Sequence, residues 1–518
     1  MNKEEITFNV DTVECKLGEI LTIERGGSPR PIKEFITDDK NGVNWIKIGD
    51  ATRSGKYILE TIQKIKPSGL KKSREVFPGD LLLSNSMSFG RPYIMGINGA
   101  IHDGWLVIRD NKRIDKNYLY HVLGSPYVFN QFSKSAKGST VRNLNIDIVS
   151  EVSIQLKPLP EQRAIVSKIE ELFSDLDKGI DDLKKAQAQL VIFRQAVLKK
   201  AFEGELTQVW REQQANLPNA DELLEQIKEE RQKHYEQQIE VWRKAVEAWE
   251  ENGKEGKKPM KPKMMKALPH LTKDEIESLP VLNKYWKWST IDNIAGHEAS
   301  SLKAGPFGSS LKKSFYTETG YKIYGQEQVI SGDSTYGNYY VNEEKFQSLI
   351  NCAIAPFDIL ISLVGTVGKV LVLPEDCEKG IINPRLVKVT LNSFYESDFF
   401  KYYFESSFLK SLYKLKNHGT TMDVLNLGSI KELPYPICTK EEQQQIVLEI
   451  ESRLSVCDNV EQSITESLEK AKALRQSILK KAFEGTLLSV EEIKACKAAK
   501  DYEPASILLK KIKAEKKK

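Results

Sequence analysis

Leu198-Lys-Lys-Ala-Phe-Glu-Gly204 occurs a second time in this chain, letter for letter, as Leu479-Lys-Lys-Ala-Phe-Glu-Gly485. The residues before it repeat with the same offset of 281 positions: Glu161-Gln162, Ile165-Val166, Ile169-Glu170 and Arg194-Gln195 recur as Glu442-Gln443, Ile446-Val447, Ile450-Glu451 and Arg475-Gln476. A repeat of this length is a duplicated domain, because the units of solenoid arrays are only a few tens of residues long. The sequence therefore predicts an approximate internal two-fold symmetry.

Each copy of the repeat belongs to a long amphipathic segment. Its apolar residues alternate steps of four and three, which is the spacing of a coiled-coil seam. Pro160 suits a first helical turn, and Gly204 suits a left-handed cap. Because each seam alone would leave an apolar stripe in water, we expect the two helices to pair with each other, antiparallel. The expected pairing residues are Ile165, Ile169, Leu176, Leu183 and Leu190 in the first helix, and Ile446, Ile450, Val460, Ile464 and Leu474 in the second.

The region before each helix has the pattern of a mixed globular domain. Asp80, Ser84, Gly90 and Arg91 surround a buried strand pattern, and they match Asp358, Ser362, Gly368 and Lys369 in the second half. We therefore expect an α+β fold class, with two globular α/β domains separated by two long helices that form an antiparallel coiled coil in a pseudo-two-fold internal repeat. The expected parts are globular domains at 1–158 and 285–437, repeated helices at 159–204 and 438–486, a central helical extension with a basic linker at 205–284, and a basic tail at 487–518.

The middle and the end of the chain give weaker signals. Residues 221–251 are strongly helical by propensity, and we find no counterpart for them after the second repeat. This helix would brace the long helices, contact a partner, or only connect to the second domain. The lysine-rich tail after Lys494 is interpreted as a solvated, frayed end rather than a phosphate clamp.

Composition excludes several classes of protein. No apolar run is long enough to span a membrane, the amino terminus lacks a signal-peptide pattern, and the six cysteines include no C-x-x-C pair. We expect a cytoplasmic protein without a metal site. The net charge of +4 is too small to indicate nucleic-acid binding by itself.

A search for catalytic motifs predicts no catalytic residue. Asn383-Pro384-Arg385-Leu386 lacks the second proline and the aromatic residue of a base-methylation tetrad. Gly365-Thr-Val-Gly368-Lys369 lacks the first glycine of a phosphate loop and the Ser or Thr that would bind magnesium. We interpret that segment as a turn between two strands.

Six short clusters instead combine small residues with Arg, Lys and Asn, which contact phosphates and base edges. Any one cluster also suits an ordinary polar loop, but the clusters fall at corresponding places in both halves. The candidate DNA-binding residues are Arg25, Ser28, Arg30, Asn85, Ser88, Arg91, Lys137, Arg142 and Asn143 in the first half, and Lys303, Ser309, Lys312, Thr366, Lys369, Asn417 and Thr420 in the second.

The order of globular region, long helix, second globular region and second long helix, with Pro160-Glu161-Gln162 opening one helix and the repeated heptapeptide closing it, resembles the DNA-specificity subunit of type I restriction-modification systems. This resemblance implies a non-catalytic subunit in which each globular region is a target recognition domain for one half of a bipartite site in double-stranded DNA. It also implies two modification subunits that dock on the helices and methylate adenine with S-adenosylmethionine, and restriction subunits that use ATP and magnesium. No cofactor is expected in this chain.

Two alternatives from other classes remain at this point. The chain would be a DNA-modifying enzyme with motifs that the search did not recognise, or a structural coiled-coil protein whose globular regions do not touch DNA.

Overall fold

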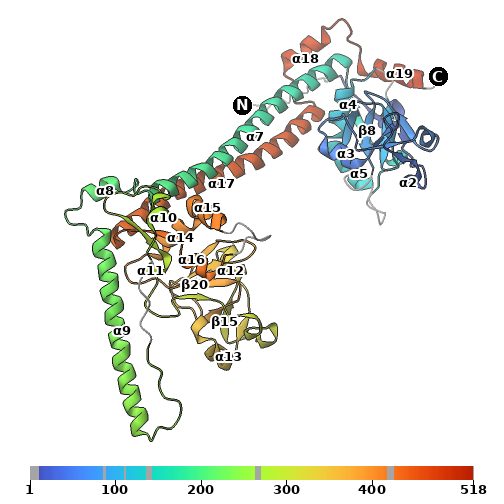
Figure 1. Cartoon of the computed structure of the whole chain (residues 1–518). Helices are drawn as coiled ribbons and strands as arrows, with labels where there is room; N and C mark the ends of the chain where they lie inside the picture. The colour runs from blue at the N-terminus through green and yellow to red at the C-terminus, as the bar shows by residue number, and fades with distance from the viewer. Residues whose placement is uncertain are drawn as a thin grey trace, which may run out of the picture. The chain divides into compact units, whose positions relative to one another are not determined.

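The computed structural model describes residues 11–85, 89–109, 113–135, 143–262, 270–416 and 425–516. It divides into two compact units (Figure 1). Unit 1 consists of Met1–Lys185 with Ser463–Lys518, and unit 2 consists of Ala186–Gln462. Each unit thus contains one globular part and one end of each long helix, so both helices belong to both units.

The two long helices are α7 (Leu159–Phe202) and α17 (Lys440–Glu484), and they run side by side (Figure 1). In unit 1 the beginning of α7 shares an apolar core with the end of α17, through Ile165, Ile169, Ile478 and Ala482. In unit 2 the end of α7 shares a core with the beginning of α17, through the corresponding residues Val197, Ala201, Ile446 and Ile450. The helices are therefore antiparallel, as the predicted internal two-fold symmetry implies.

The apolar seam is less regular than the sequence suggests. Ile165, Ile169, Ile446, Ile450 and Ile464 are buried, and Leu176, Leu183 and Leu190 are half-buried. Val460 and Leu474 differ from our expectation, because both are exposed. Ile464, Ala471 and Ile478 keep the expected spacing and are buried, whereas Arg475, one residue after Leu474, is half-buried.

Ion pairs also join the two long helices, and the duplication relates one pair in each unit. In unit 2, Arg194 of α7 donates to Asp458 at 2.6 Å and to Glu461 at 2.9 Å, both on α17. In unit 1, Arg475 of α17 donates to Asp177 of α7. Arg194 and Arg475 are equivalent residues, as are Asp177 and Asp458, so the same ion pair forms once in each unit with the helices exchanged.

The globular part of unit 1 contains three sheets. The two-stranded sheet pairs the beginning and end of the globular region, and the two five-stranded sheets carry its buried strands. The sheets, in strand order, are β1 (Val13–Lys16) with β12 (Ser153–Leu156); β2 (Thr22–Arg25), β11 (Trp105–Arg109), β8 (Leu81–Ser84), β9 (Pro92–Met95) and β5 (Tyr57–Ile58); and β3 (Ile36–Thr37), β6 (Gln63–Ile65), β4 (Val43–Ile46), β10 (Gly99–Ile101) and β7 (Arg74–Val76). The helices around them are α1 (Leu17–Ile20), α2 (Ile32–Phe35), α3 (Ile48–Arg53), α4 (Lys116–Leu123), α5 (Pro126–Ser135) and α6 (Ile146–Ser150).

Unit 2 repeats this arrangement, but its two larger sheets have four and three strands instead of five. Its sheets are β13 (Lys287–Thr290) with β21 (Pro434–Ile437); β14 (Leu302–Ala304), β20 (Leu386–Val389), β17 (Ile359–Ser362) and β18 (Val370–Val372); and β16 (Tyr340–Val341), β15 (Tyr321–Tyr324) and β19 (Gly380–Ile382). Its helices are α11 (Ile291–Ile294), α12 (Gln326–Ser331), α13 (Glu343–Ser348), α14 (Ser397–Glu405), α15 (Ser407–Lys416) and α16 (Leu427–Lys431). β2, β11, β8 and β9 of unit 1 correspond in order and pairing to β14, β20, β17 and β18. Residues 365–369 form the turn between β17 and β18, and they do not open a helix.

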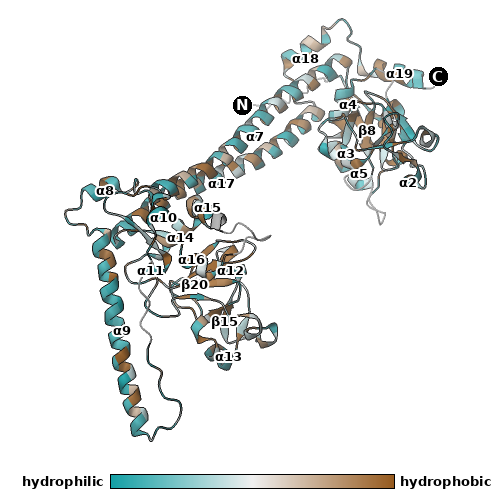
Figure 2. Cartoon of the chain, in the orientation of Figure 1, coloured by the Kyte–Doolittle hydropathy of each residue, from teal (hydrophilic) through white to brown (hydrophobic). Residues whose placement is uncertain are grey.

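After each long helix the chain forms a short helix and then a second helix whose first turns or apolar face pack against a globular part. These are α8 (Gln208–Glu212) and α9 (Ala220–Glu251) after α7, and α18 (Val490–Lys497) and α19 (Ala505–Lys516) after α17. Ala220, Leu223 and Ile227 of α9 enter the core of unit 2, although α9 is mostly hydrophilic (Figure 2). The first turns of α9 therefore brace unit 2. A small helix, α10 (Lys273–Glu277), lies in the segment between the end of α9 and the beginning of β13.

The tail corrects two of our expectations. It is not a frayed end, because Leu508, Leu509 and Ile512 of α19 are buried in the core of unit 1. It is also the counterpart of α9: Leu223-Leu224-x-x-Ile227-Lys228 matches Leu508-Leu509-x-x-Ile512-Lys513 with an offset of 285. Four additional residues after the second long helix shift the register, so the offset of 281 does not find the match. Its lysines bind the protein itself, since Lys513 pairs with Glu19 at 2.9 Å and Lys516 donates to the Leu21 carbonyl at 2.6 Å.

Ile512→Ala should lower the free energy of unfolding by about 2 to 4 kcal/mol, because it leaves a cavity under a docked helix. Ile227→Ala in α9 should cost a similar amount, and the exposed Ile507→Ala should cost little. Urea unfolding of the three variants tests this. If Ile512→Ala behaved like Ile507→Ala, the tail would not be a folded part of unit 1.

Glu161 and Glu442 are equivalent residues near the beginning of α7 and α17, and their surroundings differ. Both carboxylates are 1% exposed. Oε1 of Glu442 accepts hydrogen bonds from Arg211 Nη2 at 2.6 Å and from Thr207 at 2.9 Å, and Oε2 accepts from Trp286 Nε1 at 2.9 Å. Oε1 of Glu161 has no hydrogen-bond partner among the described residues.

Burial raises the pKa of Glu161, and the nearby Lys157 acts in the opposite direction. The folded state therefore holds this proton more tightly than the unfolded chain, whose value is near 4.5. By linkage, the contribution of Glu161 to stability falls as the pH rises from that value through the folded-state pKa.

The same substitution should consequently have opposite effects at the two sites. Glu442→Gln leaves the buried Arg211 without its counter-ion and should cost about 3 kcal/mol or more. Glu161→Gln removes a buried carboxylate whose Oε1 has no hydrogen-bond partner among the described residues, and it should raise stability at pH 7 by about 1 kcal/mol, with the gain disappearing below pH 4.5. Thermal unfolding across this pH range measures both; a loss of stability in Glu161→Gln at pH 7 would show that Glu161 has a partner.

Candidate nucleic-acid interface

In unit 2, four loops meet at one end of the four-stranded sheet. The loop after β14 is joined to β20 by the Gly305 amide, which donates to the Leu386 carbonyl at 2.9 Å. The loop after β17 is joined to the segment before β20, since the Leu363 amide donates to the Arg385 carbonyl at 3.0 Å. The start of α12 supplies Gln326. Its side chain donates to Ser362 at 2.8 Å and accepts from Arg385 Nη1 at 3.3 Å.

Unit 1 builds the same cluster from the corresponding loops. The Gly26 amide donates to the Trp105 carbonyl at 2.9 Å, and the Asn85 amide donates to the Gly104 carbonyl at 3.0 Å. Lys47 caps α3 at the position where Gly325 caps α12. Each unit therefore presents one set of loops on an equivalent scaffold.

Glycine is required where the first loop crosses the segment before the last strand. A Cβ on Gly26 would lie 2.1 Å from the His102 carbonyl oxygen, and a Cβ on the equivalent Gly305 would lie 1.8 Å from that of Asn383. Both distances are far below a normal contact. This close approach fixes the path of each loop without using a side chain.

Asp103 organises the loops of unit 1. Its carboxylate accepts from Ser28 Oγ at 2.8 Å and lies 3.5 Å from Arg30 Nη2. Its backbone carbonyl accepts from Arg25 Nε at 3.3 Å and from Asn85 Nδ2 at 2.9 Å. The hydrogen bond from Ser28 lowers the pKa of Asp103, so this carboxylate is ionised at neutral pH. Asp103 thus holds four predicted residues from two loops in one place.

His102 adjoins this cluster as a neutral side chain. Burial lowers its pKa, and its Nδ1 accepts a hydrogen bond from the Gly104 amide at 2.8 Å. It lines a hollow of about 870 Å³ together with Ser28, Arg30, Trp45 and Lys47. The loop cluster of unit 1 therefore combines three cations, Arg25, Arg30 and Lys47, with one carboxylate and an aromatic wall.

The predicted DNA-binding residues fall into four groups: exposed, half-buried, buried, and outside the described residues. Those with exposed side chains are Arg25, Arg30, Arg91, Asn143, Ser309, Lys312, Thr366 and Lys369, and those that are half-buried are Ser28 and Lys303. Asn85 is 2% exposed and holds Asp103, so it has a structural role in the loop. Ser88, Lys137, Arg142, Asn417 and Thr420 lie outside the described residues.

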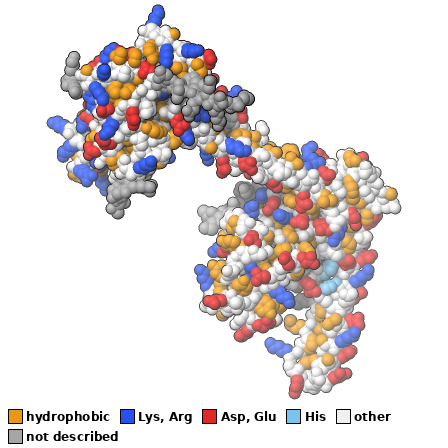
Figure 3. All heavy atoms as spheres, turned by 180° about the vertical axis from the view of Figure 1, so that it is seen from behind, with side chains coloured by type: hydrophobic (Ala, Val, Ile, Leu, Met, Phe, Trp, Pro, Cys, Tyr) orange, Lys and Arg blue, Asp and Glu red, His pale blue; other side chains and the backbone are white. Residues whose placement is uncertain are grey.

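Sequence reasoning missed several members of the two clusters: Lys47, His102 and Asp103 in unit 1, and Phe307, Gln326 and Arg385 in unit 2. Arg385 was considered only as part of a methylation motif. The offset of 281 relates His102-Asp-Gly-Trp105 to Asn383-Pro-Arg-Leu386, so the repeat could have located both segments. The two segments have no identical residue at any matching position, which is why the match was missed. Opposite charges are interspersed over the visible faces of both units, so no large basic surface marks the site on those faces (Figure 3).

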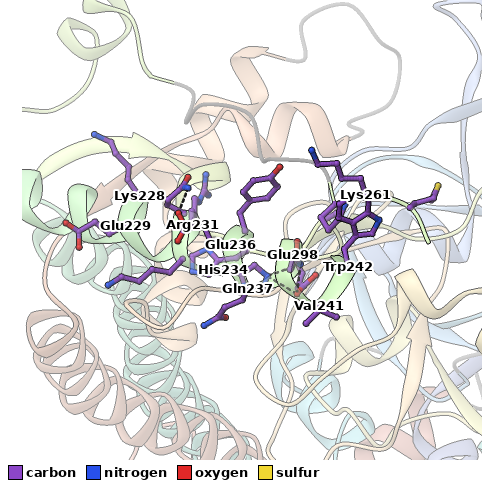
Figure 4. A pocket seen from close by; sticks show the side chains of 18 of the residues that line it. Lys228, Glu229, Arg231, His234, Glu236, Gln237, Val241, Trp242, Lys261 and Glu298 are labelled. Atoms are coloured by element: carbon purple, nitrogen blue, oxygen red, sulfur yellow. Dashed lines mark hydrogen bonds and ion pairs between the residues drawn. The ribbon is translucent and has the colours of Figure 1, made fainter. Parts of the chain in front are cut away.

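A separate hollow of about 1470 Å³ lies along α9 in unit 2 (Figure 4). Two of the three histidines that line it are paired with glutamates, His234 with Glu298 at 3.1 Å and His297 with Glu230 at 3.3 Å. Lys261 lies over the ring of Trp242 at 5.8 Å. These contacts join α9 to the globular part and to the segment that follows α9.

Comparison with known proteins identifies the family. A family model described as "Type I restriction modification DNA specificity domain" matches residues 9–185 and 307–470, which is more than half of the chain. The chain belongs to this family. Each match combines most of one globular region with a large part of the helix that follows it.

Individual relatives agree with this assignment. The specificity subunit of the type I restriction enzyme StySPI from Salmonella potsdam is 22% identical over 480 residues, which cover 89% of this chain and 86% of that protein. The EcoDI specificity subunit from Escherichia coli is 31% identical over 178 residues, 33% of this chain and 39% of the relative. The crystal structure of the HsdS subunit from Thermoanaerobacter tengcongensis superposes with a TM-score of 0.51 at 17% identity, covering 93% of this chain and 100% of that one, and supports the fold.

The chain is accordingly a specificity subunit, the non-catalytic member of a type I restriction-modification system. Among the residues that the structure describes, no group of three or more His, Cys, Asp or Glu side chains is arranged to hold a metal ion. Within the same residues, no helix is both long enough and apolar enough to cross a membrane.

Asp103→Ala should release the loop at residues 27–31 and lower stability by about 1 kcal/mol, because the carboxylate holds Ser28. Hydrogen exchange should become faster in this loop and remain unchanged at residues 306–310 of unit 2. Asp39→Ala, in an exposed turn of the same unit, is the control. Unchanged exchange at 27–31 would contradict the organising role of Asp103.

Proposed function

We propose that this chain reads a bipartite target in double-stranded DNA, with one recognition unit for each half-site. The observation that carries the proposal is the presence of equivalent loop clusters with unlike side chains. Ser28, Arg30 and Gly104 in unit 1 stand where Phe307, Ser309 and Arg385 stand in unit 2. A scaffold that is repeated while its loops differ suits two readers of different base sequences.

The chemistry of the clusters supports direct contact with DNA. Arg25, Arg30 and Lys47 in unit 1 and Lys303, Lys369 and Arg385 in unit 2 offer cations to phosphates or to guanine edges. Gln326 offers an amide, which pairs with adenine. The buried glycine crossings at Gly26 and Gly305 fix the path of the loops that carry several of these side chains.

We further propose that the long helices hold the two readers at a fixed spacing and carry two similar docking sites for modification subunits. The repeated heptapeptide presents the same exposed lysines in both copies, Lys199 and Lys200 in α7 and Lys480 and Lys481 in α17. The equivalent apolar residues Phe193 and Leu474 are exposed as well. Exposed apolar side chains at matching positions are the expected centres of two like interfaces.

In this proposal the modification subunits use S-adenosylmethionine to methylate adenine, and the restriction subunits use ATP and magnesium. This chain supplies none of these groups. Its contribution is to place the catalytic partners on a chosen DNA sequence.

Replacing residues 285–437 by the corresponding domain of another family member should change one half of the methylated motif and preserve the other half and the spacer. Trp286 is kept, since its indole donates to Glu442. The reciprocal exchange of residues 11–158 is the matched control and should change the other half. Sequencing of methylated DNA from cells with the modification subunits gives the result; a change in both halves would contradict one unit per half-site.

A further inference from the structure

Phe307 in unit 2 is an apolar side chain that the fold leaves in water. It is 86% exposed at the tip of the loop after β14. Isolated exposed apolar residues are common, but this one stands within the loop cluster proposed to face DNA. Its position therefore calls for a ligand with an apolar surface.

The backbone on either side of Phe307 is held by close packing and hydrogen bonds. Gly305 lies against the Asn383 carbonyl with no room for a side chain, and Pro306 is buried. The Gly305 amide is bonded to the Leu386 carbonyl, and the Ser310 amide donates to the Phe307 carbonyl at 2.9 Å. A loop backbone held in this way loses little conformational freedom when the ring binds, which favours affinity.

The surroundings of the ring are polar and cationic. Lys303 is half-buried at the base of the loop, and Lys312 and Lys313 are exposed just beyond it. Gln326 and Arg385 lie in the adjoining loops of the cluster. An apolar ring among groups that bind phosphates and base edges matches a DNA duplex, whose only extensive apolar surfaces are the faces of its stacked bases.

We propose that Phe307 inserts as a wedge between neighbouring base pairs of the half-site read by unit 2. Apolar side chains inserted at base steps partly unstack them and kink the duplex. The equivalent residue of unit 1 is Ser28, which is polar and bonded to Asp103 at 2.8 Å. The distortion is therefore confined to one half-site. This inference rests on the proposed function, because it assumes that the loops of unit 2 face DNA.

The test uses the full chain assembled with its modification subunits on a duplex that carries the target found by methylation mapping. Phe307→Ala should weaken binding about tenfold, which corresponds to the loss of one base–aromatic contact. Permanganate should oxidise a thymine at the wedged step in one half-site with the wild-type complex, and this reactivity should be lost in Phe307→Ala. Thymines exposed when the modification subunits flip their target adenines should stay reactive in both complexes. Phe307→Trp should retain both the affinity and the reactivity.

Phe357→Ala is the matched control. Phe357 is 56% exposed in the same unit, but it precedes β17, at the opposite end of that strand from the loop cluster. The complex with Phe357→Ala should bind the target with the affinity of the wild type. Unchanged affinity and an unchanged permanganate pattern in Phe307→Ala would overturn the wedge. Loss of modification subunits from the Phe307→Ala complex in size-exclusion chromatography would also overturn it, since the ring would then contact protein instead of DNA.

The proposed function fails separately, in the wild-type complex itself. If that complex bound the target and a scrambled duplex equally, the chain would not be a DNA reader and the wedge would fall with it. If the wild type preferred its target while Phe307→Ala behaved identically, only the wedge would be wrong.

Discussion

The structure depends on the reciprocal pairing of α7 and α17. In each unit the beginning of one helix packs against the end of the other, around Ile165 and Ile478 in unit 1 and around Val197 and Ile446 in unit 2. Burying each such side chain contributes about 1.5 to 3 kcal/mol, whereas a partly exposed ion pair contributes about 1 kcal/mol or less. The apolar contacts therefore provide most of the stability. The repeated Arg–Asp pair adds register, because it forms only when Arg194 meets Asp458 and Arg475 meets Asp177.

This pairing makes each recognition unit from distant parts of the chain. Unit 1 requires the end of α17 and the helix α19, which lie more than 300 residues after its globular region. Unit 2 requires the end of α7 and the first turns of α9. Neither unit is complete until both long helices have been made. This reciprocal packing explains why the sequences of the two helices are similar, since each residue must fit a partner helix that is also duplicated. The loops at the ends of the sheets are not under this constraint and can differ.

The sequence predicted the scaffold better than the site. The duplicated helices, their opposite directions and the two α/β regions follow from the repeat and its apolar spacing. The exposure of Val460 and Leu474 does not, because apolar spacing gives no weight to an arginine such as Arg475 that reaches an acid on the other helix. The docking of α19 was missed because four inserted residues change the offset. Arg25, Ser28 and Arg30 were found from composition, but Asp103, which gathers them, is a single acidic residue in a loop and has no sequence pattern of its own.

The central claim is that two unlike DNA readers are held on one duplicated helical scaffold. A genome-wide map of methylated adenines in cells that express this chain with its modification subunits tests it most directly. The account predicts one motif with two different specific halves, separated by a non-specific spacer of constant length. A contiguous motif, two identical halves, or a spacer of variable length would contradict it.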